Sequence, residues 1–242
     1  VIIGSTAVIK GDIFFKNTLK TEEGADINGY LKKTESTSLE AAQDEFKFIL
    51  SRGTGTDYGD DAQFFLAEAY FLNEQYMLSI QEYENLTRKM AFSPFFEKAR
   101  FRICEAYRIE SPNYYNDQSY TEKALERYRE FLDDFPESEH SKTVSESMSV
   151  LRNKLAKKLY ETGILYMKMD EFEPARMSFN QVLDLYYDTD IIGSVHYEVI
   201  KSYLKQGNDK KARSHWISKG RDSIKQEKLV LELTEVFSQK DL

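Results

Sequence analysis

One spacing, found three times, constrains the fold of this chain more than any other feature of its sequence. An aromatic residue is followed nine positions later by a small residue, and four positions after that by a second aromatic residue. The three copies are Tyr70, Ser79 and Tyr83; Tyr166, Ala175 and Phe179; and Tyr203, Ala212 and Trp216. A small side chain lets two antiparallel helices approach closely, and the flanking rings fill the groove around it. The pattern therefore predicts a series of helix hairpins.

A fourth copy has a longer loop between its two helices. Tyr107 lies near the end of the first helix, and Ala124 follows seventeen positions later instead of nine. The eight additional residues fall in the polar stretch IESPNYYNDQSY, where Ser119 and Glu122 have the spacing of a capping box for the next helix. Cys104 occupies a small-residue position facing the neighbouring helix, which predicts an inert core thiol.

A long uninterrupted helix is expected between the second and third of these hairpins. Tyr107 and Tyr166 are 59 residues apart, whereas the other neighbouring copies are 37 residues apart. The loop accounts for eight of the additional residues, and fourteen remain in SKTVSESMSVLRNKLAKKLYETGILYMK. That stretch has no proline, and its only glycine is Gly163, so it predicts a single helix with about four extra turns.

The two ends of the chain fit the pattern less well. A further copy, first in order, is indicated by Ala42, Phe46 and Ile49, with its leading helix expected in GADINGYLKKTES. Residues 1–35 are interpreted as an N-terminal arm, in which VIIGSTAVI forms a strand or an extended segment. Residues 36–220 are the repeat domain. In residues 221–242, a capping helix is favoured over a helix that binds a partner, because the apolar residues Ile224, Leu229, Leu233 and Phe237 follow helical spacing.

Composition narrows the class of protein. Glycine (11) and proline (4) are scarce, which favours helices. The formal charge of −8 argues against nucleic acid as a partner and against general attraction to anionic membranes, and favours protein partners. The apolar start of the chain is broken at Lys10 and Gly11, far short of the roughly 18–20 residues of a membrane span. One cysteine excludes an internal disulfide.

Candidate catalytic and ligand-binding groups are weak. GTGTDYGDD, residues 53–61, lacks the Gly-Lys-Ser/Thr that completes a phosphate loop, so an inter-helix loop with Asp60 or Asp61 as helix N-cap is preferred. No nucleophile is matched with a base. We therefore expect no enzymatic activity and no cofactor.

Metal binding is not expected either. The three histidines lie on different predicted elements, without the spacing of metal ligands: His140, His196 and His215. Two acidic pairs, Asp133 with Asp134 and Asp188 with Asp190, fall at repeat ends. Helix termination and turn capping explain them better than a metal or a glycosidase pair does.

The spacing and the small-residue positions resemble the tetratricopeptide repeat, a helix-turn-helix unit of about 34 residues. That resemblance implies an all-α fold, a right-handed superhelix of about five repeats. The first helices of such arrays line a concave groove. The groove positions expected here are Phe64, Glu68, Phe71, Phe101, Glu105 and Arg108, which would suit an extended peptide. An alternative is that Phe64 or Phe101 packs against the adjacent repeat.

The loop before the fourth copy's second helix is a further candidate for contact with a partner. Tyr114, Tyr115 and Asn116 lie at its centre. An ordinary solvent-exposed loop is the alternative.

Four longer motifs point to one repeat family. They are the loop ending in NDQSYTEKAL, the helix end YREFLDDFPESEH, the helix LRNKLAKKLYETGILYMK and the repeat end VLDLYYDTD. Together they resemble BamD, or ComL, lipoproteins of the outer-membrane β-barrel assembly machinery, over roughly residues 40–218. Tyr187 departs from the proline-containing YPDT that the family usually carries at that place.

The resemblance implies a non-catalytic scaffold on the periplasmic face of the bacterial outer membrane. Its expected partners are the barrel-forming subunit, through its periplasmic domains, other assembly lipoproteins, and unfolded outer-membrane proteins, whose C-terminal signal it would bind. The expected membrane contact is an N-terminal lipid, although residue 1 is Val and no lipid-bearing cysteine is seen in this chain. The alternatives are a periplasmic repeat adaptor of cell-envelope biogenesis and a repeat module attached to an enzyme.

Overall fold

The structure is a computed structural model that describes residues 36–52 and 58–239 and short strands within residues 2–32. From residue 36 onward the described chain is helical, as predicted for an all-α repeat protein. The chain forms two compact units. The first comprises Val1–Pro112 and Ser119–Ser145, and the second comprises Asn113–Gln118 and Glu146–Leu242.

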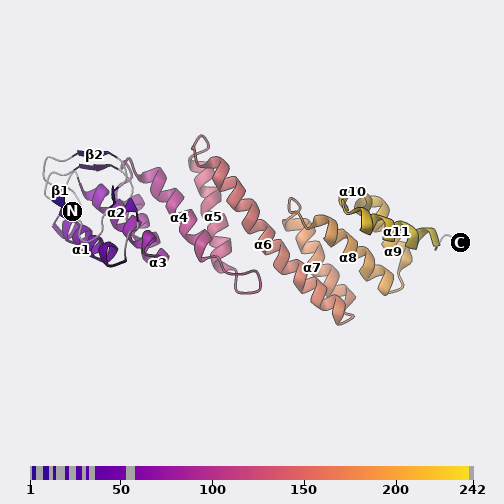
Figure 1. Cartoon of the computed structure of the whole chain (residues 1–242). Helices are drawn as coiled ribbons and strands as arrows, with labels where there is room; N and C mark the ends of the chain where they lie inside the picture. The colour runs from indigo at the N-terminus through magenta and orange to yellow at the C-terminus, as the bar shows by residue number, and fades with distance from the viewer. Residues whose placement is uncertain are drawn as a thin grey trace. The chain divides into compact units, whose positions relative to one another are not determined.

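In the first unit, consecutive helices pack each on the next (Figure 1). They are α1 (Ser36–Arg52), α2 (Gly59–Leu72), α3 (Tyr76–Lys89), α4 (Phe96–Glu110) and α5 (Ser119–Asp134). Helices α2 and α3 form one predicted hairpin, and α4 and α5 form another. Helix α1 supplies the second helix of the expected first copy, because Ala42 and Phe46 are buried and the Phe46 ring stacks on Phe65 at 6.2 Å.

The leading helix expected before α1 is replaced by short strands, so that prediction was wrong. The strands are β1 (Ile2–Ile3), β2 (Val8–Lys10), β3 (Ile13–Phe14), β4 (Lys20–Thr21), β5 (Asp26–Asn28) and β6 (Leu31–Lys32). They form three parallel pairs with one common offset, because Ile2 pairs with Lys20, Val8 with Asp26, and Ile13 with Leu31. The glycines of GADINGYLKKTES disfavour a helix there.

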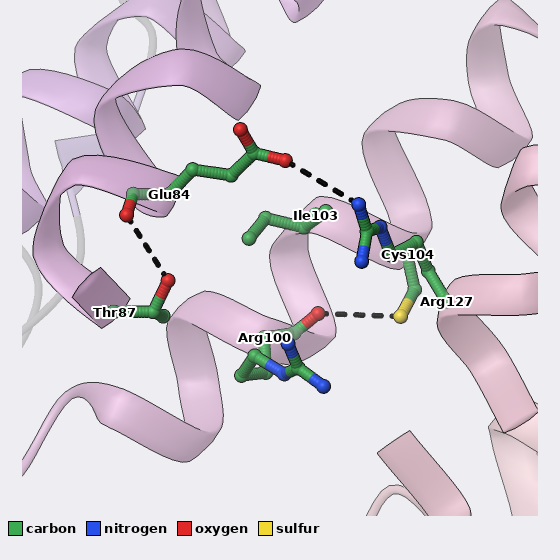
Figure 2. A pocket seen from close by; sticks show the side chains of 6 residues that line it. All are labelled: Glu84, Thr87, Arg100, Ile103, Cys104 and Arg127. Carbon is green, nitrogen blue, oxygen red and sulfur yellow. Dashed lines mark hydrogen bonds and ion pairs between the residues drawn. The ribbon is translucent and has the colours of Figure 1, made fainter. Parts of the chain in front are cut away.

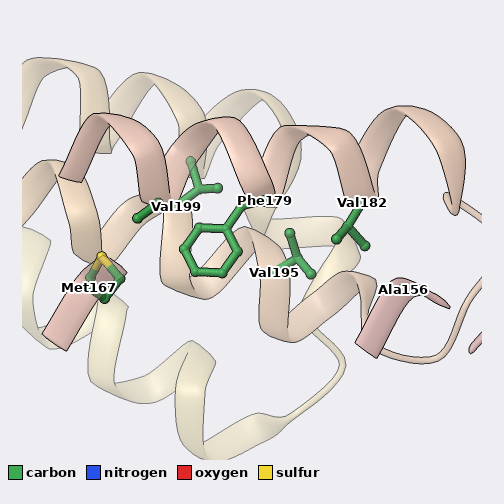
Figure 3. Packing of buried hydrophobic residues seen from close by; sticks show 7 residues of the cluster. Ala156, Met167, Phe179, Val182, Val195 and Val199 are labelled. Carbon is green, nitrogen blue, oxygen red and sulfur yellow. The ribbon is translucent and has the colours of Figure 1, made fainter. Parts of the chain in front are cut away.

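The second unit continues from α6 (Ser141–Lys168), whose first residues belong to the first unit. At 28 residues, α6 confirms the predicted long helix. The following elements are α7 (Phe172–Leu185), α8 (Ile192–Lys205), α9 (Asp209–His215), the π-helical turn η1 (Trp216–Gly220), α10 (Arg221–Ser223) and α11 (Glu227–Gln239). Figure 3 shows the cluster that joins α6, α7 and α8 around Phe179, with Ala156 and Met167 from α6 and Val195 and Val199 from α8.

The constant nine-residue spacing has a common turn as its cause. The residue four positions after the first aromatic residue has positive φ in all three copies: Glu74 (60°), Asp170 (59°) and Gly207 (74°). In each turn the carbonyl of that aromatic residue accepts a hydrogen bond from the backbone N–H five positions later, at 2.8–3.0 Å. The same turn therefore sets the same register between the two helices each time.

The small residues lie where close helix packing requires them. Ser79, Ala124, Ala175 and Ala212 are all completely buried, as predicted. Ala175 belongs to α7, and the cluster around its helix includes Ala156 of α6. These positions confirm the packing that was read from the spacing.

The last helix covers the C-terminal hydrophobic cluster. Leu233 and Phe237 of α11 are buried, and the Phe237 ring stacks on Trp216 at 6.3 Å. The hydroxyl of Tyr197 in α8 donates a hydrogen bond to Glu232 at 2.7 Å. Ile224 is also buried but precedes α11, so it contributes to this packing from the connection to the helix.

Candidate partner-binding site

Glu68, one of the predicted groove residues, is committed to bonds within the helix stack. Its side chain is fully buried. It accepts a hydrogen bond from the Tyr83 hydroxyl of α3, and two from Arg102 of α4, at 2.7 and 3.0 Å. A buried carboxylate needs such partners because its desolvation is costly. Glu68 is therefore not an exposed groove residue, and the prediction that placed it on an open surface was wrong.

Glu105 occupies the equivalent place in the next hairpin and has equivalent partners. Like Glu68, it lies two residues before the first aromatic residue of its copy. It accepts hydrogen bonds from the Tyr128 hydroxyl of α5 and from Arg108, whose Nη2 lies 2.6 Å away. Burial alone would raise the pKa of Glu105, but the hydrogen bonds from Arg108 and Tyr128 outweigh it and hold the pKa below its usual value. The side chains of Glu105 and Arg108 remain half-buried.

Phe64 and Phe101 are also equivalent positions, and each packs on a residue that leads into the next hairpin. Phe64 is fully buried and stacks on Phe95 with ring centroids 4.5 Å apart. Phe101 stacks on His140 at 4.0 Å, with the rings 7° from parallel. For Phe64 the predicted exposed position was wrong, and packing against the adjacent repeat is the correct reading. Phe101 is half-buried and keeps some exposed surface.

Phe71 is the predicted groove aromatic that lies nearest the end of its helix. It is half-buried at the C-terminal end of α2. Its ring meets the Tyr76 ring edge-on at 5.2 Å, and the Arg102 guanidinium lies 4.7 Å from its centroid. The Glu68–Arg102 pair thus supports a partly exposed aromatic surface in the first unit.

The predicted contact loop is ordered against α6. Lys158 donates to the carbonyl of Asn116 at 2.7 Å, and the Lys157 ammonium lies 4.5 Å from the centre of the Tyr114 ring. Gln118 is buried and bonds the same Asn116 carbonyl at 3.1 Å. Tyr115 is 66% exposed, with its hydroxyl 3.1 Å from the Asn113 amide that donates to it. The contacts with α6 therefore hold the loop in place while the Tyr115 side chain stays exposed.

A small pocket in the first unit surrounds Cys104 (Figure 2), with a cavity volume of about 20 Å³. Burial raises the pKa of the Cys104 thiol to about 12, and the thiol donates to the carbonyl of Arg100 at 3.2 Å. Arg127 pairs with Glu84 and with Glu130. The lining therefore holds a protonated thiol and cations that already have partners, and the burial of the thiol agrees with the core position expected for it.

The glycine-rich loop is only partly described. Residues 53–57 lie outside the described residues, and with them most of the candidate phosphate loop. Helix α2 begins at Gly59 and follows Tyr58, so Asp60 and Asp61 lie in its first turn, and neither is the N-cap that we expected. Asp60 instead accepts a hydrogen bond from Ser93 at 2.8 Å. Acidic residues in a first turn still interact favourably with the helix dipole.

One acidic residue of each predicted pair at the repeat ends is held by an arginine. Asp134 pairs with Arg100 at 2.9 Å. Asp188 receives a fork of hydrogen bonds from Arg152, and this partner lowers the pKa of Asp188. These contacts give Asp134 and Asp188 structural roles, in which arginines supply partners that the expected helix termination and turn capping did not include.

Two histidines that looked unrelated in the sequence lie together. His196 of α8 and His215 of α9 have Nδ1 and Nε2 2.9 Å apart. The shared hairpin turn brings these positions opposite each other, which a search for helical ligand spacing does not detect. No cluster of three or more potential metal-ligating side chains occurs among the residues that the structure describes.

Comparison with known proteins identifies the family. A family profile described as YfiO, outer membrane lipoprotein, matches residues 29–217. The chain belongs to this family. The resemblance to BamD and ComL lipoproteins is thereby confirmed, and the YfiO family places the chain among the lipoproteins of outer-membrane assembly. No helix of the described residues is long and apolar enough to cross a membrane.

Solved structures resemble the chain only distantly. MamA is 11% identical, with 86% of this chain and 98% of that chain covered and a TM-score of 0.31. A Podosopora anserina putative kinesin light chain with nearly identical TPR-like repeats is 16% identical, with 73% of this chain and 81% of that chain covered and a TM-score of 0.33. No curated protein matches the chain. The YfiO assignment therefore rests on the family match, and the fold rests on the hairpins themselves.

Proposed function

We propose that this YfiO-family protein is a non-catalytic scaffold of the outer-membrane β-barrel assembly machinery. It binds the periplasmic domains of the barrel-forming subunit and the C-terminal signal of unfolded outer-membrane proteins. The family match over residues 29–217 is the observation that carries this proposal. The inert Cys104 thiol and the paired carboxylates of the hairpins support a role in binding over one in catalysis.

The surface proposed for the client signal is the partly exposed face of the first unit. Phe71 supplies a ring supported by Arg102, and Phe101 supplies a second half-buried ring. Arg108 remains half-buried beside Glu105 and offers a cation near the surface. Aromatic surface next to a cation suits a peptide that ends in an aromatic residue and a carboxylate.

The surface proposed for the barrel-forming subunit and for other assembly lipoproteins is the loop that carries Tyr115. Exposed tyrosines lose little conformational entropy on binding and are enriched among the residues that dominate interface energies. The hydrogen bonds of Asn116 with Lys158 and Gln118 hold the loop in place before a partner arrives. Such preorganisation lowers the cost of binding.

Affinity purification from envelope membranes tests the scaffold role. The tagged chain should recover a β-barrel protein with periplasmic repeat domains. Tyr115→Ala should lower that recovery at least about fivefold, which corresponds to the loss of one important interface side chain. Tyr187→Ala is the matched control, because Tyr187 is 74% exposed in the same unit. If the wild type recovers no such protein, the proposed role in the assembly machinery is contradicted. If Tyr115→Ala and Tyr187→Ala lower recovery equally, the proposed contact through the loop is contradicted.

Binding of a synthetic peptide ending in phenylalanine tests the client surface. Calorimetry should give a dissociation constant about tenfold weaker for Phe71→Ala than for the wild type, since a lost aromatic contact costs about 1–2 kcal/mol. Phe92→Ala, at a fully exposed ring of the same unit, should bind as the wild type does. If Phe71→Ala binds the peptide as tightly as the wild type does, the client signal does not bind at the surface around Phe71.

A further inference from the structure

Arg176 of α7 is the most deeply buried arginine among the described residues. Its exposed fraction is 8%. Other arginines that are half-buried each bond at least one carboxylate of the chain, and these are Arg100, Arg102, Arg108, Arg127 and Arg152. Arginine is almost never buried without such a partner, because the loss of hydration must be compensated. Arg176 is therefore expected to have a partner that compensates for its lost hydration.

The chain supplies Arg176 with a hydroxyl and a ring, and with no carboxylate among the described residues. Its Nη1 donates to the Ser202 hydroxyl of α8 at 3.3 Å, and its guanidinium lies 4.4 Å from the centre of the Tyr203 ring. A guanidinium has five N–H donors in a planar fork. Ser202 occupies one of them, and no nitrogen of Arg176 is both enclosed and without a partner. The remaining donors can therefore be reached from solvent.

The acidic residue nearest in sequence does not pair with Arg176. Glu173 lies three positions before it on α7, the spacing at which Arg108 pairs with Glu105. Glu173 is nevertheless exposed, and no ion pair links it to Arg176 in the described structure. Glu173 therefore does not supply the carboxylate that the other buried arginines have.

A second cation lies on the same aromatic ring. The Lys211 ammonium of α9 is 5.9 Å from the centre of the Tyr203 ring, so cations from two helices lie within 6 Å of the centre of this ring. Arg176 contributes a planar guanidinium with several N–H donors, and Lys211 contributes a compact ammonium charge. The planar guanidinium of Arg176 can donate two parallel hydrogen bonds to the two oxygens of a carboxylate, and the Lys211 ammonium adds a positive charge that attracts its negative charge. The fork would also fit a phosphate, but the net charge of −8 disfavours a dianion more than a singly charged carboxylate.

We propose that Arg176, Ser202 and Lys211 form a carboxylate-binding subsite for a partner polypeptide, near the start of α7, the end of α8 and the start of α9. Arg176 receives the carboxylate in its fork, Tyr203 holds the guanidinium plane, and Lys211 adds a second charge. The carboxylate comes from an acidic side chain or from a chain end. The subsite does not depend on the function proposed above, because small carboxylates test it without the assembly machinery.

The test is a titration of the full ¹⁵N-labelled chain, followed through the side-chain Nε–Hε signal of Arg176. The signal is assigned by its absence from Arg176→Gln. N-acetylglutamate α-methylamide, which carries a side-chain carboxylate, or N-acetylglycine, which carries a terminal one, should shift it saturably. The compound that binds more tightly identifies the source. Lys211→Gln should weaken binding about two- to fivefold, the range of an exposed charge contact.

Controls separate specific binding from general attraction and from a structural role. Arg129 is exposed in the first unit, and its signal should show no saturation. Arg176→Lys keeps the charge but not the fork and should lose most of the carboxylate binding while retaining helicity. Glu173→Gln should bind as the wild type does. An Arg176 signal that does not saturate, an equal response at Arg129, or tighter binding of inorganic phosphate overturns the proposal.

Discussion

Gly163 shows how closely the side chains of a hairpin meet. It lies on α6 opposite Phe179 of α7, a completely buried ring. A Cβ placed on Gly163 would lie 2.4 Å from Phe179 Cε1 and 2.7 Å from Cδ1. Non-bonded carbon atoms essentially never lie so close together, so a Cβ at position 163 would force the Phe179 ring to move. The absence of a side chain at position 163 is therefore what allows the Phe179 ring to fill the space between the helices.

We expect Gly163→Ala to destabilise the protein. Alanine normally stabilises a helix relative to glycine by about 0.5–1 kcal/mol. Overpacking against an enclosed ring costs about 1–3 kcal/mol and should exceed that gain. Urea unfolding followed by circular dichroism measures the difference, and Glu161→Ala, at an exposed position of the same helix, is the control. A variant as stable as the wild type would show that the ring can move aside freely.

The sequence predicted the buried residues better than it predicted the exposed ones. Ser79, Ala124, Ala175 and Ala212 were found because helix packing imposes a spacing that repeats. The exposure of Phe64 could not be predicted in the same way, because it depends on Phe95, which lies in the connection to the next hairpin. The carboxylate of Glu68 is likewise covered by a residue that arrives from α4. Groove residues depend on what the following hairpin covers, and a pattern within one repeat does not contain that information.

At the scale of elements, the turns explain why helix boundaries were predictable. One hydrogen-bonded turn recurs in three hairpins with Glu74, Asp170 or Gly207 at the position of positive φ. Gly207 favours this conformation and an aspartate such as Asp170 adopts it more readily than most residues, so turn chemistry alone would have missed Glu74. Helix α6 was predicted at its observed length because it lacks any helix-breaking proline. Before α1, strands β1 and β2 agree with the strand or extended segment expected in VIIGSTAVI, whereas the strands from β3 to β6 were not predicted, because each has only two or three residues.

The contact between α8 and α9 should respond to acid. Burial, His215 and Lys219 lower the pKa of His196 from 6.5 to about 4, and burial and Lys219 also lower the pKa of His215. Both histidines are therefore neutral in the folded protein under conditions in which the unfolded chain already binds protons. Their contribution to stability is complete above the unfolded value of 6.5 and is lost as the pH falls toward 4.

The prediction is that acidification from about pH 7.5 to about pH 4.5 lowers the free energy of unfolding more in the wild type than in the His196→Asn/His215→Asn variant, by about 1–2 kcal/mol. Urea unfolding at several pH values gives the two slopes. Parallel slopes for the wild type and the double variant would contradict the assignment.

At the scale of the whole molecule, the first unit is a set of hairpins in which a residue that leads into one hairpin covers a ring of the hairpin before it. Phe95 and His140 cover equivalent rings of successive hairpins, and α11 covers the last cluster. Stability in such arrays comes from contacts between neighbours. The family could be predicted from four motifs in the middle of the chain, since these carry its particular loop and its long helix. The partners could not be derived in the same way, because the contacts of Tyr115 with Asn113 and Tyr114 leave most of its ring exposed and do not specify what binds there.

The chain has one tryptophan, and Trp216 lies in the cluster covered by α11. Its emission therefore samples the environment of the C-terminal hairpin alone. At some denaturant concentrations the Trp216 emission could shift to the red while the far-ultraviolet circular dichroism is unchanged. Such a shift would show that α11 detaches before the other helices unfold. The fold thus contains an intrinsic optical probe for loosening at one end.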